Sequence, residues 1–396
     1  MFEALPEPKA DAILGLMAIY KADSRTDKVD LGVGVYKASA GKTPVMRAVK
    51  NAEKKLLETQ DTKSYVGPTG SAPFCAAMIA QVFGTDADTS RIRAVQSVGG
   101  SGALRVLADL LKEGRPEADI WVSDPTWPNH MPLLSAAGLT LQTYPYYNTA
   151  TSQVDIEAML AALGRAKRGD IVLLHGACHN PTGADLSLDE WSRVTDVLLE
   201  NDLFPFVDLA YQGFGDGLEE DAAAVRMLAS RMPEMVVAAS CSKNLGLYRE
   251  RVGAAILIGK NEAEATRAHG RLGSVIRSNY SMPPDHGANT TELVLSNSEL
   301  GADWREELES MRLRMVSLRE SFSDALRKRS NSDRFDYIAQ QKGMFSRLPL
   351  NKTQIDKLRD DYGIYMVGDG RINVAGLPDE GLDKLADAIC TVISDT

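Results

Sequence analysis

From about residue 90 onward, the chain alternates between apolar stretches of strand length and segments with the hydrophobic period of a helix. The apolar stretches include RAVQSVGG, ADIWVSD, DIVLLHGA, LFPFVDLAY, MVVAASCSK and GAAILIG. Helical patterns follow several of them, for example over residues 103–112 and 188–200. Strands that alternate with helices favour a mostly parallel, doubly wound sheet. We therefore expect an α/β fold in which helices flank the sheet.

The length of 396 residues is more than one hydrophobic core usually holds. Residues 304–328 carry one long amphipathic pattern, which predicts a helix that links a large domain to a C-terminal unit. We predict an N-terminal arm at 1–12, a small domain at 13–44 and 305–396, and a large cofactor-binding domain at 45–304. Within the small domain, residues 29–36 are expected to form a strand, and Thr43-Pro44 is expected to open a helix.

Composition argues against several classes of function. The net charge is −10 and no dense Lys/Arg run occurs, which disfavours nucleic-acid binding. The four cysteines lie far apart without a CxxC pair, which predicts neither a disulfide framework nor a zinc site; they are Cys75, Cys178, Cys241 and Cys390. No apolar run approaches the roughly 18 residues that span a bilayer. We expect a cytoplasmic protein that binds no membrane, nucleic acid or metal.

Polar side chains follow the predicted strands, and ligands of open parallel sheets bind at the carboxyl ends of strands. Lys243 directly follows an apolar strand. A lysine at this position is ordinarily solvated. If it is partly desolvated, its amine loses a proton more readily and can form a Schiff base. Asp208 ends another apolar strand, where it would either cap a turn or pair with a buried cation such as a protonated pyridine nitrogen. The other residues at strand ends are Gly99, Gly100, Ser101, Gly102, Trp127, Asn180 and Tyr211.

Some features suit the binding of anions. The GGSG segment precedes a predicted helix and would either bind phosphate or form a tight turn. Arg105 stands where a dinucleotide fingerprint needs its third glycine, which argues against nicotinamide cofactors. Arg251 could bind a phosphate through two hydrogen bonds. Arg371 is either a surface residue at a strand end or a clamp for a substrate carboxylate.

Specific motifs occur in one order along almost the whole chain. They run from DLGVGVYK to GRINVAGL and include TWPNH, LHGACHNPTG, DLAYQGFGDG, SKNLGLYRERVGA and NYSMPP. Together they resemble subgroup Iα of the class I pyridoxal-phosphate aminotransferases, the aspartate/aromatic family, and most of all its bacterial aromatic-amino-acid branch. The resemblance implies an aspartate-aminotransferase-like fold, pyridoxal 5′-phosphate as cofactor, and a homodimer with composite active sites. It also implies ping-pong transfer of amino groups from aromatic and dicarboxylic amino acids to 2-oxoglutarate or oxaloacetate.

The resemblance further implies a role for each matching residue. Lys243 would attach the cofactor and shuttle a proton, and Asp208 would bind the pyridine nitrogen. Tyr211 and Asn180 would contact the phenolate oxygen, Trp127 would stack on the ring, and His130 and His175 would support this network. The phosphate would be held by Gly100, Ser101, Ser240, Ser242 and Arg251, together with Tyr65 of the partner subunit. The substrate would meet Arg371, Gly34, Asn180, Trp127 and, from the partner subunit, Arg277. Cis peptide bonds are expected before Pro125 and Pro181.

The sequence departs from the aspartate-specific pattern at three positions. Ser101 stands where threonine is common, Cys241 follows Ser240, and Met282 replaces the asparagine of NYSNPP. These departures put strict aspartate specificity in doubt and leave the reaction type unchanged. Four alternatives remain: an aspartate-preferring aminotransferase with weak aromatic activity, another pyridoxal-phosphate reaction on the same fold, a nicotinamide-dependent oxidoreductase and a non-catalytic binding module.

Overall fold

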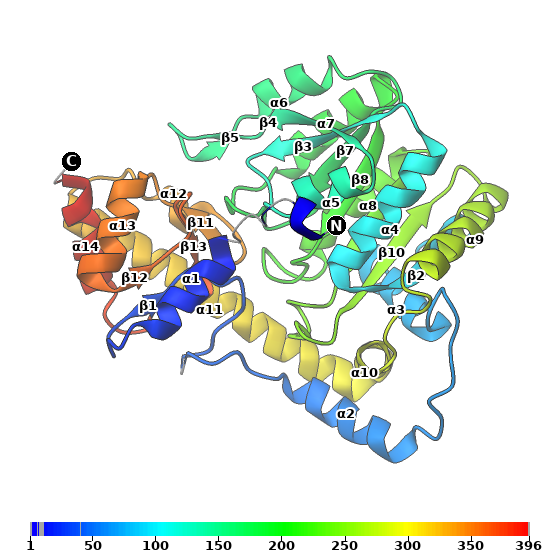
Figure 1. Cartoon of the computed structure of the whole chain (residues 1–396), viewed down its shortest axis with the longest axis horizontal. Helices are drawn as coiled ribbons and strands as arrows, with labels where there is room; N and C mark the ends of the chain where they lie inside the picture. Colours follow the sequence, from blue (N-terminus) through cyan, green and yellow to red (C-terminus); the bar gives the residue numbers. More distant parts are fainter. Residues whose placement is uncertain (1, 6, 8–11, 40, 395–396) are drawn as a thin grey trace. The chain divides into compact units, whose positions relative to one another are not determined.

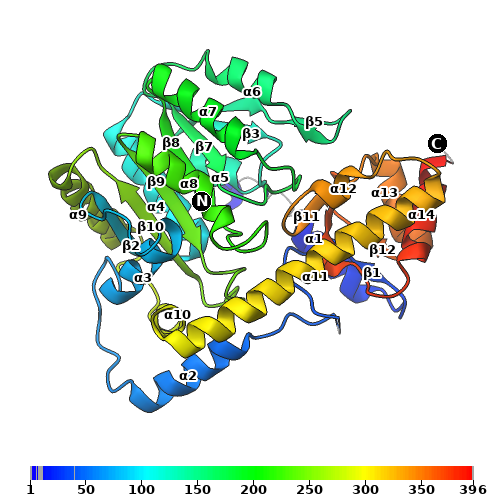
Figure 2. The same ribbon diagram turned by 180° about the vertical axis from the view of Figure 1, so that it is seen from behind.

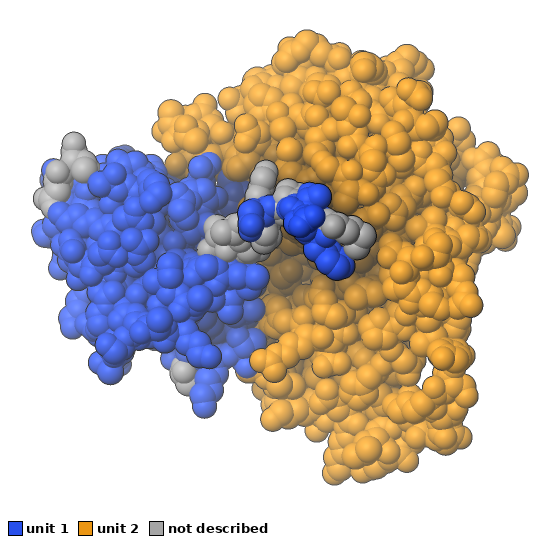
Figure 3. Space-filling model, viewed as in Figure 1, with its two compact units in different colours: residues 1–43, 181–183, 315–396 blue, residues 44–180, 184–314 orange. Residues whose placement is uncertain are grey.

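The computed structural model describes residues 2–5, 7, 12–39 and 41–394. The chain divides into two compact units, which Figure 3 distinguishes by colour. Unit 1 comprises residues 1–43, 181–183 and 315–396, and unit 2 comprises residues 44–180 and 184–314. Half of the predicted arm lies outside the described residues, and the predicted division into domains stays a prediction.

Unit 2 is built on a seven-stranded sheet (Figure 1). In spatial order its strands are β2 (Ile92–Val98), β10 (Val252–Ile258), β9 (Met235–Ser240), β8 (Phe204–Leu209), β7 (Ile171–His175), β3 (Asp119–Asp124) and β4 (Thr140–Pro145). Strand β10 runs antiparallel to both neighbours, and the other pairs are parallel. The mostly parallel α/β architecture predicted from the alternating pattern is confirmed.

Helices cover both faces of this sheet. Helices α4 (Gly99–Gly114) and α9 (Glu262–Asn279) lie on the face in view in Figure 1, and α7 (Leu188–Glu200) and α8 (Glu220–Arg231) lie on the face in view in Figure 2. Unit 2 also contains α2 (Arg47–Thr59), α3 (Ala72–Phe83), α5 (His130–Ala136), α6 (Ile156–Leu163), α10 (His286–Ser296) and the hairpin of β5 (Tyr147–Asn148) and β6 (Gln153–Val154). Apolar side chains such as Leu107, Ile120 and Phe206 fill the core between sheet and helices.

Unit 1 combines short strand pairs with helices around its own core. Strand β1 (Val29–Asp30) pairs in parallel with β12 (Ile364–Tyr365), and β11 (Phe345–Arg347) pairs antiparallel with β13 (Arg371–Asn373). Its helices are α1 (Ala12–Ala22), α12 (Tyr337–Gln340), α13 (Lys352–Tyr362) and α14 (Leu382–Ser394), with 3-10 turns at Phe2–Ala4 and Val374–Gly376. Helix α11 (Ser298–Ser330) contributes residues to both units and confirms the long helix predicted over 304–328.

Two element predictions near the N-terminus are wrong in extent. The strand expected over 29–36 ends at Asp30, because the Asp30 carboxylate accepts a hydrogen bond from the Gly32 N–H at 3.0 Å and turns the chain. The helix expected to open at Thr43-Pro44 begins only at Arg47. None of the described helices is both long enough and apolar enough to cross a membrane.

Candidate active site

The carboxyl ends of β8 and β9 bring Asp208 and Lys243 to one edge of the sheet. These strands are parallel neighbours with Asp208 opposite Ala238, and Lys243 lies three residues after the end of β9, so Asp208 and Lys243 belong to adjacent strand ends, as predicted. The Lys243 ammonium nitrogen lies 5.0 Å from the centre of the Tyr211 ring. Burial lowers the pKa of the Lys243 amine; the charge of Asp208 opposes this effect, and that of Arg251 adds to it. A lowered pKa makes the amine available as a nucleophile and base.

Asp208 is buried and receives a hydrogen bond from an imidazole. Its Oδ2 lies 3.0 Å from Nε2 of His130. Burial by itself raises the pKa of the Asp208 carboxyl, but the hydrogen bond from His130, together with the nearby charge of Lys243, outweighs burial, so the pKa is lowered. The carboxylate is therefore ionised at neutral pH and can hold a buried cation.

A threonine hydroxyl joins His130 to a second imidazole. Thr126 Oγ1 lies 2.8 Å from His130 Nδ1 and 3.2 Å from His175 Nε2. Because an ionised Asp208 only accepts hydrogen bonds, a neutral His130 donates through Nε2 and accepts through Nδ1 from the Thr126 hydroxyl. Burial lowers the pKa of His175 to about 3, which keeps this imidazole neutral. The predicted supporting role of His130 and His175 thus has a direct hydrogen-bonded route to Asp208, through a residue that sequence reasoning missed.

The turn that carries Asn180 is held by hydrogen bonds and ring contacts of neighbouring residues. His179 is bonded through Nε2 to the Ser123 hydroxyl at 3.0 Å and stacks on Tyr146 with ring centres 4.0 Å apart. The backbone N–H groups of residues 178 and 179 both donate to the Asp185 carboxylate, at 2.7 and 2.8 Å. Asn180 itself is buried. Layered contacts of this kind hold a polar side chain in one orientation.

The first turn of α4 forms a cradle of a size and charge that suit a phosphate. Helix α4 begins at Gly99, so GGSG is its first turn and not a loop before it. A Cβ added to Gly99 would lie 2.7 Å from an Arg251 guanidinium nitrogen, and one added to Gly100 would lie 2.9 Å from Ser240 Cβ. Only glycines allow this arginine and serine to lie so close to the helix N-terminus. Free helix N–H groups, a guanidinium and hydroxyls together form the donor set for a phosphate group.

Other predicted residues occupy neighbouring positions of unit 2. The Trp127 ring meets the His130 ring edge-on at 5.2 Å and packs partly buried against the core. Ser101 lies in the first turn of α4, and Ser242 donates its backbone N–H to the Ser240 hydroxyl at 3.2 Å. The peptide bond before Pro125 is cis, as predicted. The one before Pro181 is not, so that prediction is wrong; trans is the lower-energy form of most X–Pro bonds.

Unit 1 brings together Arg371 and Gly34. Arg371 is buried, donates to the Gly32 carbonyl at 2.8 Å, and lies with its guanidinium carbon 4.5 Å from the centre of the Phe345 ring. A Cβ on Gly34 would lie 3.0 Å from Phe345 Cζ, so the glycine lets the chain pass close to this ring. Phe345 was not predicted as a site residue, because in the sequence it is one more apolar residue of a strand.

Tyr65 and Arg277 lie on the surface of unit 2, outside the hydrogen-bonded group around Asp208. Tyr65 is 93% exposed, and Arg277 near the end of α9 is exposed and bonded to the Ser281 hydroxyl. Exposed tyrosine and arginine side chains are available to a second molecule.

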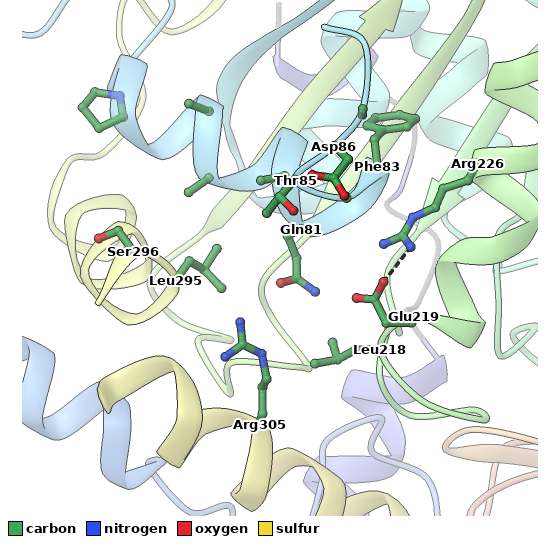
Figure 4. Close-up of a pocket in the computed structure, with 16 residues that line it drawn as sticks. Gln81, Phe83, Thr85, Asp86, Leu218, Glu219, Arg226, Leu295, Ser296 and Arg305 are labelled. Atoms are coloured by element: carbon green, nitrogen blue, oxygen red, sulfur yellow. Dashed lines mark hydrogen bonds and ion pairs between the residues drawn. The ribbon is translucent and has the colours of Figure 1, made fainter. Parts of the chain in front are cut away.

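A separate groove of about 830 Å³ on unit 2 is lined by none of the predicted site residues (Figure 4). Gln81, Leu218, Arg226 and Arg305 are among the residues that line it. The Arg226 guanidinium is neutralised by Glu219 at 2.6 Å. We therefore assign the chemistry to the sheet edge and not to this groove.

Comparison with known proteins places the chain in a family. Residues 26–389 match the family model "Aminotransferase class I and II". The aromatic-amino-acid aminotransferase of Paracoccus denitrificans is 49% identical to this chain over 98% of each chain. The aspartate aminotransferase of Salmonella typhi is 43% identical over 99% of this chain and all of its own. The crystal structure of the aromatic-amino-acid aminotransferase from Burkholderia pseudomallei, covalently bound to pyridoxal phosphate, superposes with a TM-score of 0.97 at 42% identity over 99% of both chains. The chain therefore belongs to the class I and II aminotransferase family and is a transaminase with the pyridoxal-phosphate-dependent transferase fold.

Proposed function

We propose that this transaminase uses pyridoxal 5′-phosphate to move amino groups from aromatic and dicarboxylic amino acids to 2-oxoglutarate or oxaloacetate. The observation that carries the proposal is the pairing of Lys243, whose amine has a lowered pKa, with an ionised, buried Asp208 on the adjacent strand. When bound, this cofactor supplies an aldehyde that condenses with amines and a ring that withdraws electrons.

The residues at the sheet edge match the cofactor group by group. Asp208, kept ionised by His130, would hold the pyridine nitrogen in its protonated form. The phosphate would lie in the cradle of Gly100, Ser101, Ser240, Ser242 and Arg251. Trp127 would cover one face of the ring, while Tyr211 and Asn180 would donate to its phenolate oxygen.

Lys243 would attach the cofactor covalently and, once displaced by the substrate amine, act as a base. Burial keeps the amine from being permanently protonated, so it can take the proton from the α-carbon of the amino acid and return it to the cofactor side. A general base works best when its pKa lies near the working pH.

Support for the substrate range comes from the relatives and from the arginines. Relatives named for aromatic amino acids and for aspartate both match the full chain. Arg371, with Gly34, Asn180 and Trp127, would bind the α-carboxylate common to all substrates. Arg277 from the partner subunit would bind the side-chain carboxylate of aspartate or glutamate. An aspartate-preferring enzyme with weak aromatic activity is the second candidate, because Arg277 is retained.

We also propose a cytoplasmic homodimer. The exposure of Tyr65 and Arg277 suits residues that complete the site of a partner subunit. All four cysteines are free and buried, which suits a reducing compartment.

The test is a coupled assay of purified protein with phenylalanine or aspartate and 2-oxoglutarate, in which glutamate should appear. Lys243→Ala should abolish turnover, since covalent attachment and proton transfer are both lost. Lys243→Arg, which keeps the charge but lacks the reactive amine, should fail equally. Full activity in either variant would remove Lys243 from the reaction.

A further inference from the structure

Tyr65 and Arg277 lie on two segments of unit 2 that are far apart in sequence and close in space. We define the Tyr65 loop as residues 60–71, which connect α2 to α3, and the post-α9 loop as residues 280–285, which follow the helix bearing Arg277. Each loop has exposed residues, but both are hydrogen-bonded to one buried side chain, that of Gln96 on β2.

Gln96 uses its whole amide to join the two loops. It is fully buried; its Oε1 accepts from the Ser71 N–H at 3.0 Å, and its Nε2 donates to the Pro284 carbonyl at 2.6 Å. Its own backbone N–H donates to the Thr69 carbonyl at 2.9 Å. Because a buried amide loses much free energy when either end is left without a partner, these bonds fix the separation of the two loops.

Two glycines allow this close packing. Gly70 has a φ of +75°, and a Cβ there would lie 2.3 Å from Gln96 Cβ, so any other residue would displace the amide. Gly273 lies on α9 one turn before Arg277, and a Cβ there would lie 3.3 Å from the Thr69 methyl group. The helix that bears Arg277 is therefore packed directly against the Tyr65 loop.

Two further bonds connect the loops beyond Gln96. The Gln60 side chain donates to the Asp285 carboxylate at 3.1 Å. The Val66 N–H, next to Tyr65, lies 3.2 Å from the Met282 sulfur. The residue after Tyr65 thus contacts the position that departs from the aspartate-specific motif. Through these contacts, the Tyr65 loop, the post-α9 loop and the end of α9 are held together as one packed group.

We propose that Gln96 is a positioning residue that holds the backbone segments carrying Tyr65 and Arg277 in a fixed relation, so that one buried amide sets both cofactor affinity and preference for dicarboxylic substrates. This rests on the proposed function, in which Tyr65 binds the cofactor phosphate and Arg277 the side-chain carboxylate at the partner's site. The two ends of the amide act separately. The bond to Ser71 holds the Tyr65 loop, and the bond to Pro284 holds the loop that follows Arg277.

Substitutions at Gln96 can break one end or both. Gln96→Glu keeps the oxygen that accepts from Ser71 and, when its carboxyl is ionised, loses the donor to the Pro284 carbonyl, so this variant is assayed at alkaline pH. We expect kcat/KM for aspartate to fall about tenfold and that for phenylalanine by less than about threefold, the effect of roughly one buried hydrogen bond. Affinity of the cofactor-free protein for pyridoxal phosphate, measured by titration, should stay near wild type. Gln96→Met removes both ends without burying a charge and should weaken cofactor affinity as well.

Gln354→Glu provides the matched control. Gln354 is also buried; its Nε2 donates to the Val392 carbonyl at 3.3 Å and its Oε1 accepts from the Asn351 N–H at 2.9 Å, all within unit 1. This variant should leave the aspartate-to-phenylalanine ratio unchanged.

Three outcomes separate the explanations. Equal loss on both substrates in the Gln96 variants, or the same shift of ratio in Gln354→Glu, would make Gln96 merely structural and overturn the inference. If Gln96→Glu does not fold, the ratio and cofactor affinity of Gln96→Met decide. Arg277→Leu is assayed in parallel: if it leaves aspartate turnover intact, the proposed role of Arg277 fails, whatever Gln96 does.

Discussion

Arg277 is the residue on which the proposed substrate range depends. A guanidinium that faced an apolar ring without a counter-charge would cost several kcal/mol, so it must be free to turn toward solvent when an aromatic substrate binds. Its exposure at the end of α9 is compatible with that freedom. We predict that Arg277→Leu lowers kcat/KM for aspartate by orders of magnitude and spares phenylalanine.

The control for this prediction is Arg271→Leu. Arg271 lies on the same helix and is paired with Glu113 at 2.6 Å, so its loss should affect neither substrate selectively. Steady-state kinetics with both amino donors make the comparison. An equal loss of kcat/KM for aspartate and phenylalanine in Arg277→Leu would show that Arg277 has a structural role. A wild-type protein active only on aspartate would refute the proposed activity on aromatic amino acids.

Residues at strand ends could be predicted from the sequence, and residues that support them could not. Asp208 follows an unbroken apolar run and Lys243 comes shortly after another, so the pattern itself places them at the sheet edge. Thr126, Phe345 and Gln96 act through partners that lie from 26 to 188 positions away, and nothing in their local sequence marks these contacts. Long-range packing, which single-sequence patterns do not encode, decides their roles.

At the scale of elements, α11 is bonded to the turn that carries Lys243. The buried Trp304 indole N–H donates to the Asn244 carbonyl at 2.7 Å, one residue after Lys243. Trp304→Phe keeps most of the apolar surface and removes this bond. We predict a loss of about 1–3 kcal/mol in the free energy of unfolding, because a buried carbonyl is left without its donor. Denaturant titration measures it.

The matched control for Trp304→Phe is Trp121→Phe. The Trp121 indole also donates a hydrogen bond, to Asp170 at 2.9 Å, but on β3. Both variants should lose stability, whereas only Trp304→Phe should alter the absorbance spectrum of the cofactor attached at Lys243. An unchanged spectrum in Trp304→Phe would mean that α11 does not position this turn.

Element boundaries differ from the sequence prediction where side chains bond to the backbone. The pattern over residues 29–36 resembles a strand, but the Asp30 carboxylate binds N–H groups that a strand would need for pairing. The GGSG segment was expected to precede a helix, either as a phosphate-binding segment or as a tight turn. It is instead the first turn of α4, where the close approach of Arg251 and Ser240 requires glycine.

At the scale of the whole molecule, buried neutral imidazoles make stability depend on pH. Burial lowers the pKa of His175 to about 3 and that of His179 well below its ordinary value of 6.5. Below pH 6.5 the unfolded chain therefore binds protons that the folded protein does not. Stability is full above about pH 6.5 and falls on acidification by about 1.4 kcal/mol per pH unit for each such histidine.

Urea titrations of the cofactor-free protein between pH 7 and 5, at one protein concentration, test this dependence. His175→Gln should lower the pH dependence of the free energy of unfolding by roughly one proton. An identical slope in wild type and His175→Gln would show that His175 is protonated in the folded protein.

In the proposed homodimer, Arg277 of each subunit would complete the active site built around Lys243 of the other subunit. This arrangement can be tested on the whole assembly. In a hybrid of one Lys243→Ala chain and one Arg277→Leu chain, one site receives both substitutions and the other receives neither. Each homodimer should be inactive toward aspartate, since every site lacks either the amine or the guanidinium. We predict that the hybrid, isolated by two different affinity tags after co-expression, recovers aspartate turnover at one site per dimer. If Lys243 and Arg277 instead served the site of their own chain, each site of the hybrid would carry one defect, and the hybrid would be as inactive as the two homodimers.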